Sequence, residues 1–119
     1  MVKKLVRENL INMYYKLDEN KNVVKSSLKE FATFMEGALP TNYRRVGDDT
    51  IDGYRISTVF IGLCHNFDHR AEVPIVFETM VFKGKKSDIY MERYSSWQEA
   101  EEGHQRVVEW VKNGCKEDD

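Results

Sequence analysis

The sequence predicts an α+β domain, in which an antiparallel meander of about four to six strands carries a short helix from the N-terminal half and a C-terminal helix. Segments of strand composition follow one another between polar turns. Two Ser-x-x-Glu capping boxes mark the starts of helices. The chain has 119 residues, the size of one small domain. We expect a single domain over residues 1–119, with an acidic tail at 115–119 that frays.

The first predicted helix begins after Ser27, whose side chain forms a capping box with Glu30. Apolar residues follow at helical spacing, and Gly37 is expected to close the helix in a left-handed conformation before Pro40. Residues 1–12 have only weak helical periodicity and are expected to form a short helix.

The C-terminal helix begins at a second capping box, formed by Ser96 and Glu99, and runs to about Asn113. Gly114 stands where a C-cap glycine is expected. The helical spacing places one stripe toward the core, made of Trp97, Ala100, His104, Val107 or Val108, and Val111.

The strands are predicted from β-branched and aromatic composition between turn residues. "MYYKLDENKNVVKS" reads as two short strands around a turn at Asp18 to Asn22. The later strands are expected over 42–49, 54–67, 73–82 and 89–95. Short polar loops between consecutive strands favour an antiparallel meander with helices on one face.

Composition and charge exclude several classes of protein. Hydrophobic residues make up 41% of the chain, charged residues 32%, and the net charge is −2 with a pI near 5.9. We therefore expect no nucleic-acid partner. Because the chain lacks a membrane-length apolar run and a signal peptide, we expect a cytoplasmic protein that does not bind membranes. Cys64 and Cys115 lack metal-ligand spacing and are expected to be reduced thiols.

Glu78 stands out because it lies among apolar residues in the predicted strand 73–82. Side chains alternate along a strand, so Glu78 shares a face with Met80 and Phe82. Both faces of the strand are mostly apolar, which predicts a central strand covered on each side. A partly buried carboxylate needs a partner, and the candidates are Arg93, Arg55 and His104.

These residues define one candidate polar cluster. Gly103 lies beside His104 and costs about 1 kcal/mol relative to alanine in a helix, which suggests a close backbone approach at that point. The cluster is either a structural knot, in which an arginine holds Glu78 and His104 is hydrogen-bonded in the core, or the wall of a binding pocket. Its members are Glu78, Arg93 and His104, with His65, Asn66 and Asp68 from the end of a strand.

The motifs indicate no known chemistry. His65, Asp68 and His69 could ligate a metal, but this spacing on a loop is weak evidence, and we expect neither a metal nor a cofactor. Ser57 and Thr58 lack a nucleophile-elbow motif. The glycines are scattered and form no phosphate-binding loop. We therefore expect no enzymatic activity.

Three segments together resemble a family of small, functionally uncharacterised bacteriophage and prophage proteins: "ISTVFIGLCHNF", "PIVFETMVF" and "ERYSSWQEAEEGH". The similarity covers Ser57 to His104, with a weaker echo in "VVKSSLKEFATFME". It implies a phage origin and an α+β domain, and it assigns no catalytic residue. Cys64 stands where the family has an aspartate before the histidine, which argues further against a catalytic role.

Three functional hypotheses follow. The favoured one is a small cytosolic phage-type accessory protein that binds a host component non-covalently, for instance in counter-defence, either alone or as a homodimer. Aromatic residues would anchor such an interface, among them Tyr14, Tyr15, Tyr43 and Trp110.

The alternatives are a binder of a small, nucleotide-like ligand and an enzyme. The ligand binder would use Arg44, Arg45 or Arg93 against phosphate and an aromatic ring against a base. The enzyme would use Glu78 and His104 as an acid–base pair within hydrogen-bond reach.

Overall fold

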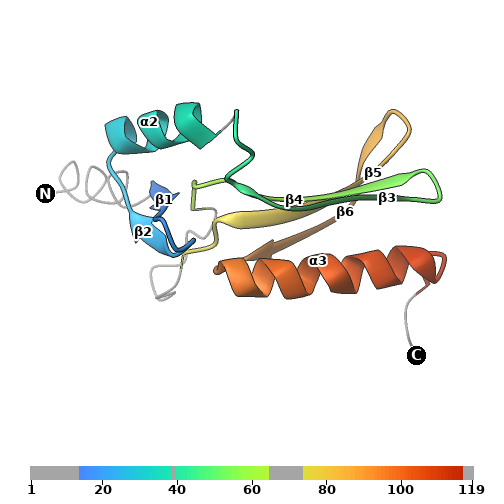
Figure 1. Cartoon of the computed structure of the whole chain (residues 1–119). Coiled ribbons are helices and arrows are strands. Elements are labelled where there is room, and N and C mark those ends of the chain that lie inside the picture. Colours follow the sequence, from blue (N-terminus) through green and yellow to red (C-terminus); the bar gives the residue numbers. More distant parts are fainter. Residues whose placement is uncertain (1–13, 39, 65–73, 117–119) are drawn as a thin grey trace, which may run out of the picture.

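The structure of the chain, a computed structural model, describes residues 14–38, 40–64 and 74–116. These residues form a four-stranded antiparallel sheet, a two-stranded sheet and two helices (Figure 1). The predicted α+β class is confirmed. The helix expected over residues 1–12 lies outside the described residues.

The main sheet is a meander in the order β3-β4-β5-β6. The turn between its first two strands consists of Asp52 and Gly53, both with positive φ, at 51° and 84°. This Asp-Gly pair suits the tight hairpin turn whose twist matches that of the flanking strands. The strands are β3 (Arg45–Ile51), β4 (Tyr54–Phe60), β5 (Phe77–Lys83) and β6 (Lys86–Tyr94).

Strands β4 and β5 are shorter than predicted, because β4 ends at Phe60 and β5 begins at Phe77. Gly62 has a φ of 73°, and a Cβ there would lie 2.9 Å from the Tyr15 carbonyl oxygen. The chain leaves the ladder near this glycine, whose carbonyl oxygen accepts the Tyr15 amide at 2.8 Å. Composition did not predict this bend, because the residues on either side of it remain strand-like.

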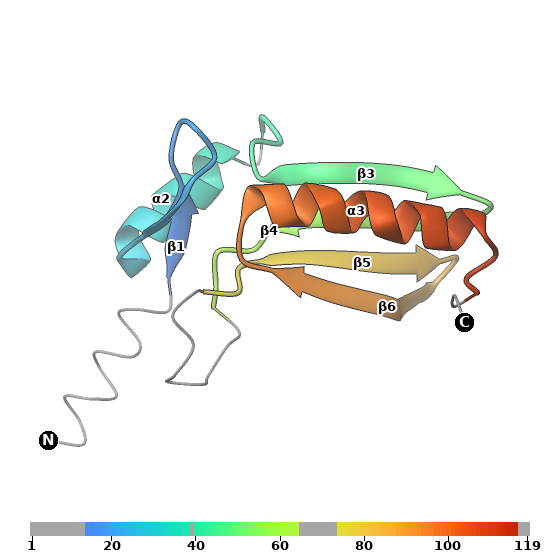
Figure 2. The same ribbon diagram turned by 90° about the horizontal axis from the view of Figure 1, so that it is seen from below.

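Helix α3 (Trp97–Lys112) covers one face of the main sheet (Figures 1 and 2). Ser96 is its N-cap and accepts a hydrogen bond from the Glu99 amide, and Gly114 has positive φ beyond its end, both as predicted. The predicted stripe is buried at Ala100, His104, Val107, Val108 and Val111.

Helix α2 (Leu28–Ala38) lies at one end of the main sheet, beside the hairpin of β1 (Tyr15–Leu17) and β2 (Val23–Lys25) (Figure 1). The predicted capping box at its start is present. The predicted end at Gly37 is wrong, since this glycine lacks positive φ and the helix continues to Ala38.

Two clusters form the core. One lies toward α2, where the ring of Phe60 packs against Phe34 and Phe77 at centroid distances of 5.8 and 5.2 Å. The other lies between the sheet and the C-terminal half of α3 and includes Ile56 and Val81. Among the described residues, no helix is long and apolar enough to cross a membrane.

Candidate functional site

Glu78 pairs with Arg93, directly opposite on the neighbouring strand, with 3.2 Å between Oε2 and Nε. The Glu78 side chain is 15% exposed, so it is partly buried as expected. The other two candidate partners are engaged elsewhere, Arg55 with Asp48 and His104 with an aspartate of β3. The Glu78–Arg93 pair ties β5 to β6 across the sheet.

His104 and Glu78 lie on opposite faces of the main sheet. Glu78 directly precedes Thr79, which is buried on the face toward α3, and side chains alternate along β5. His104 projects from α3 onto that buried face, where Thr79 is part of its hydrogen-bond network. The geometry therefore gives Glu78 and His104 no hydrogen-bond contact, and they do not form an acid–base pair.

A continuous chain of hydrogen bonds runs through His104. Its Nε2 is 2.7 Å from Asp49 Oδ2, and its Nδ1 is 2.7 Å from Thr58 Oγ1. Thr58 Oγ1 lies 2.5 Å from Thr79 Oγ1, which lies 2.9 Å from the Tyr94 hydroxyl. One residue comes from each of β3, α3, β4, β5 and β6, so the chain of bonds joins α3 to all the strands of the main sheet.

The donors and acceptors of this network are consistent in one direction. The Asp49 carboxylate can only accept, so His104 Nε2 is the donor to it. With a neutral imidazole, Nδ1 then accepts from Thr58, Thr58 accepts from Thr79, and Thr79 accepts from Tyr94. Burial raises the pKa of the Tyr94 hydroxyl, so this group keeps the proton that it donates. No buried side-chain nitrogen or oxygen in the described part of the chain lacks a hydrogen-bond partner.

Two glycines make room for the two aromatic rings of the network. A Cβ on Gly47 would come within 2.6 Å of His104 Nε2, and a Cβ on Gly103 would collide with the Tyr94 ring. The close approach inferred at Gly103 is therefore present, and its partner is Tyr94. From here on, the polar chain means the five hydrogen-bonded residues Asp49, His104, Thr58, Thr79 and Tyr94.

The polar chain contains a threonine, a histidine and an aspartate in the order that nucleophilic catalysis uses. Thr58 and Thr79 are fully buried and His104 is 3% exposed, so a substrate cannot reach the hydroxyl. Within the polar chain, only Asp49 opens to solvent, with half of its side chain exposed. The arrangement fits a structural role, in which the polar chain orients α3 on the sheet.

Only one member of this network, His104, belongs to the polar cluster that the sequence predicts. His104 was singled out by its place on a buried helical stripe, whereas Asp49, Thr58, Thr79 and Tyr94 were not assigned to the cluster. Thr58 and Thr79 face each other in the strand register, a pattern that suits two hydroxyls under one helix. The bonds of Thr58 to His104 and to Thr79 depend on tertiary structure, because these partners are 46 and 21 positions away in the chain.

Three members of the predicted cluster, His65, Asn66 and Asp68, lie outside the described residues, as does His69. Among the residues that are described, no group of three or more His, Cys, Asp or Glu side chains could hold a metal ion.

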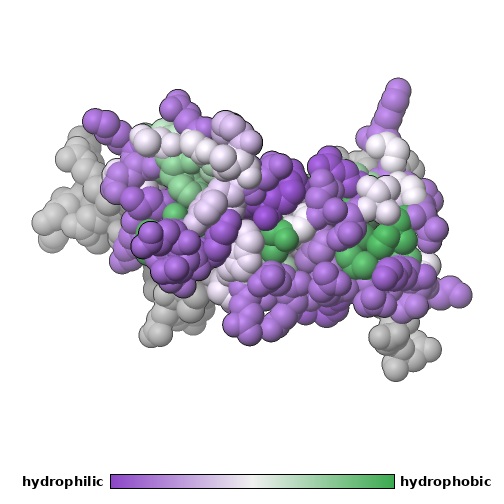
Figure 3. Space-filling view, in the orientation of Figure 1, coloured by the Kyte–Doolittle hydropathy of each residue, from purple (hydrophilic) through white to green (hydrophobic). Residues whose placement is uncertain are grey.

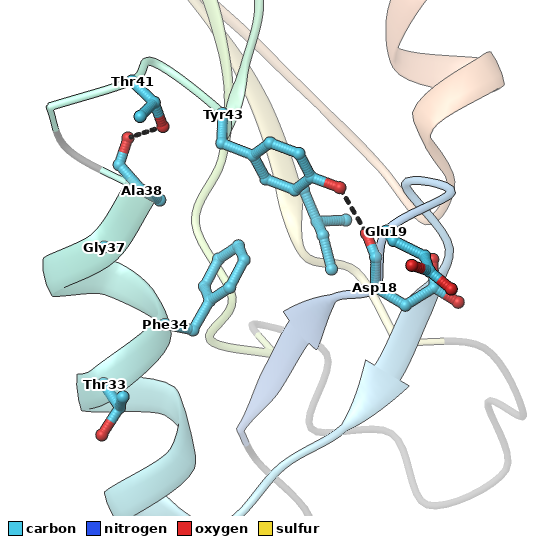
Figure 4. A pocket seen from close by; sticks show the side chains of 9 residues that line it. Asp18, Glu19, Thr33, Phe34, Gly37, Ala38, Thr41 and Tyr43 are labelled. Carbon is cyan, nitrogen blue, oxygen red and sulfur yellow. Dashed lines mark hydrogen bonds between the residues drawn. The ribbon is translucent and has the colours of Figure 1, made fainter.

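An apolar hollow lies between α2 and the β1–β2 hairpin (Figure 4). It measures about 360 Å³ and is lined by the rings of Phe34 and Tyr43. The Tyr43 hydroxyl donates to the Asp18 carbonyl oxygen at 2.5 Å, and so is already engaged. A separate hollow of about 70 Å³ is lined by Arg44 and Arg45 and contains no aromatic ring.

A third hollow, of about 530 Å³, lies where the β1–β2 turn meets the start of α3. Its lining includes Lys21, Trp97 and Glu101. The Lys21 ammonium lies 4.5 Å from the centre of the Trp97 ring and donates to the Tyr43 carbonyl oxygen at 2.5 Å. The cation and the ring of this hollow are therefore already in contact with each other.

The aromatic residues expected to anchor an interface are less accessible than predicted. Tyr15 is buried, and Tyr14, Tyr43 and Trp110 are only partly exposed. Their rings pack within the molecule instead, as Trp110 does against Tyr90 at a centroid distance of 5.0 Å. Composition does not distinguish a ring that anchors a partner from one that packs against its own chain.

The face of the main sheet opposite α3 is not covered by any helix of the described part of the chain (Figure 1). We call it the open face. The expectation that β5 is covered on both sides is therefore not met within these residues. Strand pairing and alternation give the rows of the open face. They are Arg45, Val59, Glu78 and Arg93; then Asp48, Ser57, Met80 and Met91; then Thr50, Arg55 and Phe82. Ile89 is added by alternation along β6, because the β5–β6 register shifts beyond Tyr90.

One half of the open face is apolar and the other half is polar. Met80, Phe82, Ile89 and Met91 form a block on β5 and β6, which we call the apolar block; Ile89 and Met91 are 38% and 43% exposed. The ion pair Glu78–Arg93 lies at one end of the block, and the pair of Asp48 with Arg55 lies on its flank. An apolar centre with a charged rim is the usual anatomy of a protein–protein interface.

Comparisons of the chain with protein-family models, with curated proteins and with solved structures found no match.

Proposed function

We propose that this chain is a small phage-type accessory protein that acts by non-covalent binding to a host protein through the open face of its main sheet. The observation that carries the proposal is the apolar block, in which Ile89 and Met91 are exposed and Met80 and Phe82 are partly exposed, with one ion pair at its end and another on its flank. Large apolar side chains exposed side by side lose water favourably when a partner covers them. The mixed charges of the rim suit a protein surface better than a polyanion, which would require an excess of positive charge.

The buried half of the molecule supports a binding role over a catalytic one. The polar chain is sealed between α3 and the sheet, so its hydroxyls and imidazole are not available to a substrate. Glu78, the other carboxylate of interest, is held by Arg93 on the open face. The contacts of the polar chain and of Glu78 therefore fit a role in stabilising the fold.

A nucleotide-like ligand is the weaker proposal. Such a ligand needs a cation for phosphate and a ring for the base in one pocket. In the described residues, the hollow with Arg44 and Arg45 contains no ring, and the hollow with Phe34 and Tyr43 contains no arginine. The third hollow has a lysine and a tryptophan, but the two already contact each other. The open face is therefore the surface that best fits a partner.

The test compares two charge-introducing variants of the full chain. Phe82→Glu places a carboxylate in the apolar block, while Gln98→Glu adds the same charge on the exposed surface of α3. Each variant is first checked for an unchanged circular dichroism spectrum. Proteins captured from a bacterial lysate by the wild-type chain are identified, purified separately and titrated against all three chains by calorimetry.

We expect one purified host protein to bind the wild-type chain and Gln98→Glu equally, and to bind Phe82→Glu at least tenfold more weakly. Equal binding of Phe82→Glu would show that the open face is not the binding surface. The absence of any purified protein that binds with defined stoichiometry would overturn the proposed function itself.

A further inference from the structure

We infer that β6 is a self-pairing edge, through which two copies of the chain join β6 to β6 in antiparallel fashion and form one eight-stranded sheet. The inference rests on the proposed function, because the dimer would extend the same open face. The strand that pairs with β6 comes from a second copy of this chain. The two edges of the sheet and the position of the apolar block both favour this partner.

The outer edge of β6 has no strand beside it among the described residues. At nine residues, β6 is the longest strand of the sheet. Three consecutive large apolar residues lie near its middle, Ile89, Tyr90 and Met91, which are 38%, 36% and 43% exposed. A long edge strand with an exposed apolar run is a template for pairing with another strand.

The backbone direction shows which groups are available for this pairing. The Tyr94 carbonyl oxygen accepts the Val76 amide at 3.0 Å, so the polar backbone groups of Tyr94 point toward the β5 side. Backbone groups alternate along a strand, and those of Tyr90 therefore point inward as well, opposite Val81. The amides and carbonyls of Ile89 and Met91 point outward, to the edge without a partner strand.

The other edge of the sheet, β3, has the features that discourage pairing. Its ladder is interrupted by a bulge between Arg45 and Gly47, and Asp48 and Asp49 are exposed side by side. Bulges and charges on an edge strand are devices that prevent association. Figure 3 shows this side of the molecule, where hydrophilic residues predominate and apolar colour is confined to separate patches. The β5–β6 ladder also shifts register, between Val81 and Lys83, so the difference between the two edges lies in their side chains. The exposed run Ile89, Tyr90 and Met91 makes β6 the edge better suited to self-pairing.

Charge limits the registers open to two antiparallel copies of β6. Centring the pair on Glu92 or on Arg93 would place each of these charges opposite its own copy, and like charges at facing positions destabilise a sheet. Centring it on Tyr90 would bring Asp88 opposite Glu92, which is again a pair of like charges. Centring it on Ile89 or Met91 places an apolar residue opposite its own copy and brings no like charges to facing positions of the strand. The two-fold axis is therefore expected at Ile89 or at Met91.

The apolar block is placed so that this dimer would extend it. The block occupies β5 and β6, next to the pairing edge, and the two blocks would meet across the two-fold axis. Four strands of about seven residues give a flat area of roughly 450 Å² for one open face. Standard interfaces bury roughly 800 Å² per partner, a size that two adjoining faces reach. Figure 2 shows β6 beyond the side of α3, where the helix does not obstruct its edge.

The first test is the mass of the protein in solution. Sedimentation equilibrium of the full chain should show a concentration-dependent shift from 14.0 kDa toward twice that mass.

The second test is cross-linking in a background with Cys64 and Cys115 replaced by serine. Ile89→Cys, Met91→Cys and an equal mixture of the two are treated with a short thiol reagent. At least one of the three should form a covalent dimer, and which of them does so gives the register. Thr50→Cys, exposed on β3, is the matched control and should not cross-link.

A further pair of variants separates backbone pairing from simple apolar contact. Met91→Pro removes an outward amide that the β5–β6 ladder does not use, and should raise the dimer dissociation constant at least tenfold while the fold is retained. Met91→Ala keeps the amide and should have a smaller effect. If the proline variant unfolds, Met91→Lys replaces it, since an edge lysine also opposes pairing.

A monomer at every concentration, with no cross-link through residue 89 or residue 91, would overturn the inference. So would a dimer that cross-links through Thr50→Cys instead. Neither result affects the host-binding proposal, which is decided by the comparison of Phe82→Glu with Gln98→Glu.

Discussion

The polar chain is the feature of this molecule in which single residues matter most. Its groups are mostly buried, and each has a partner, so removing one group leaves another unsatisfied in a region of low dielectric. Gly47 and Gly103 belong to the same system, because a side chain at either position would displace His104 or Tyr94. Substitutions at these positions are therefore expected to be energetically coupled.

Gly47→Ala should lower the free energy of unfolding by about 1–3 kcal/mol, because the new Cβ would overlap the His104 ring. His104→Ala should cost about 1–3 kcal/mol by leaving Asp49 and Thr58 without their partner. In the double variant the overlap is gone, and the two costs should not add. Urea unfolding of the four proteins measures this coupling, and strict additivity would contradict the contact.

Tyr94→Phe should reduce the loss of stability at high pH. Burial raises the Tyr94 pKa above its ordinary value of 10.0, so the unfolded chain releases this proton at lower pH than the folded chain does. The stability that depends on this proton is therefore fully present below about pH 10 and falls as the pH rises toward the folded pKa.

Urea unfolding at about pH 8 and about pH 11 tests the prediction, since the fall between the two should be smaller in Tyr94→Phe than in the wild type. Some fall should remain, because burial also raises the Tyr15 pKa. An identical fall in both proteins would show that Tyr94 does not titrate differently on folding.

At the scale of elements, capping and side-chain spacing account for both helices. Ser27 and Ser96 each accept an amide three residues on, as their motifs predict. The exception is Gly37, which lies within α2, with open space where a Cβ would be. A glycine there costs conformational entropy and makes no compensating contact.

Gly37→Ala should therefore raise the free energy of unfolding by about 0.4–1 kcal/mol. Gly53→Ala is the matched control, because it also has open space but has a φ of 84° that disfavours any side chain. It should destabilise the protein. Thermal unfolding of the two variants should shift in opposite directions, and a destabilised Gly37→Ala would contradict the helical conformation at this position.

At the scale of the whole molecule, the two faces of the main sheet differ in what covers them. The face under α3 holds the fully buried residues of β4 and β5, such as Ile56 and Val81. The open face carries the apolar block and the two ion pairs. The sheet thus has one face that packs against α3 and one face that we propose as the binding surface.

Native-state hydrogen exchange should report how stability is distributed over the sheet. The amides of β4 and β5 should exchange most slowly, because both strands are internal in the sheet and carry most of its buried side chains. In dilute protein the outward amides of Ile89 and Met91 should exchange rapidly, and that of Tyr90 should be protected. Protection of all three at every dilution would indicate that this edge is already covered within one chain.

The sequence by itself determined the fold class, both capping boxes, the buried stripe of α3 and the need of Glu78 for a partner. These features depend on local spacing and on alternation, which are properties of short segments. It did not determine which arginine pairs with Glu78, or that His104 lies on the other face. Those outcomes depend on strand register and on where α3 crosses the sheet. Only the tertiary structure decided them, because it brings together residues such as Thr58 and His104 that are far apart in the chain.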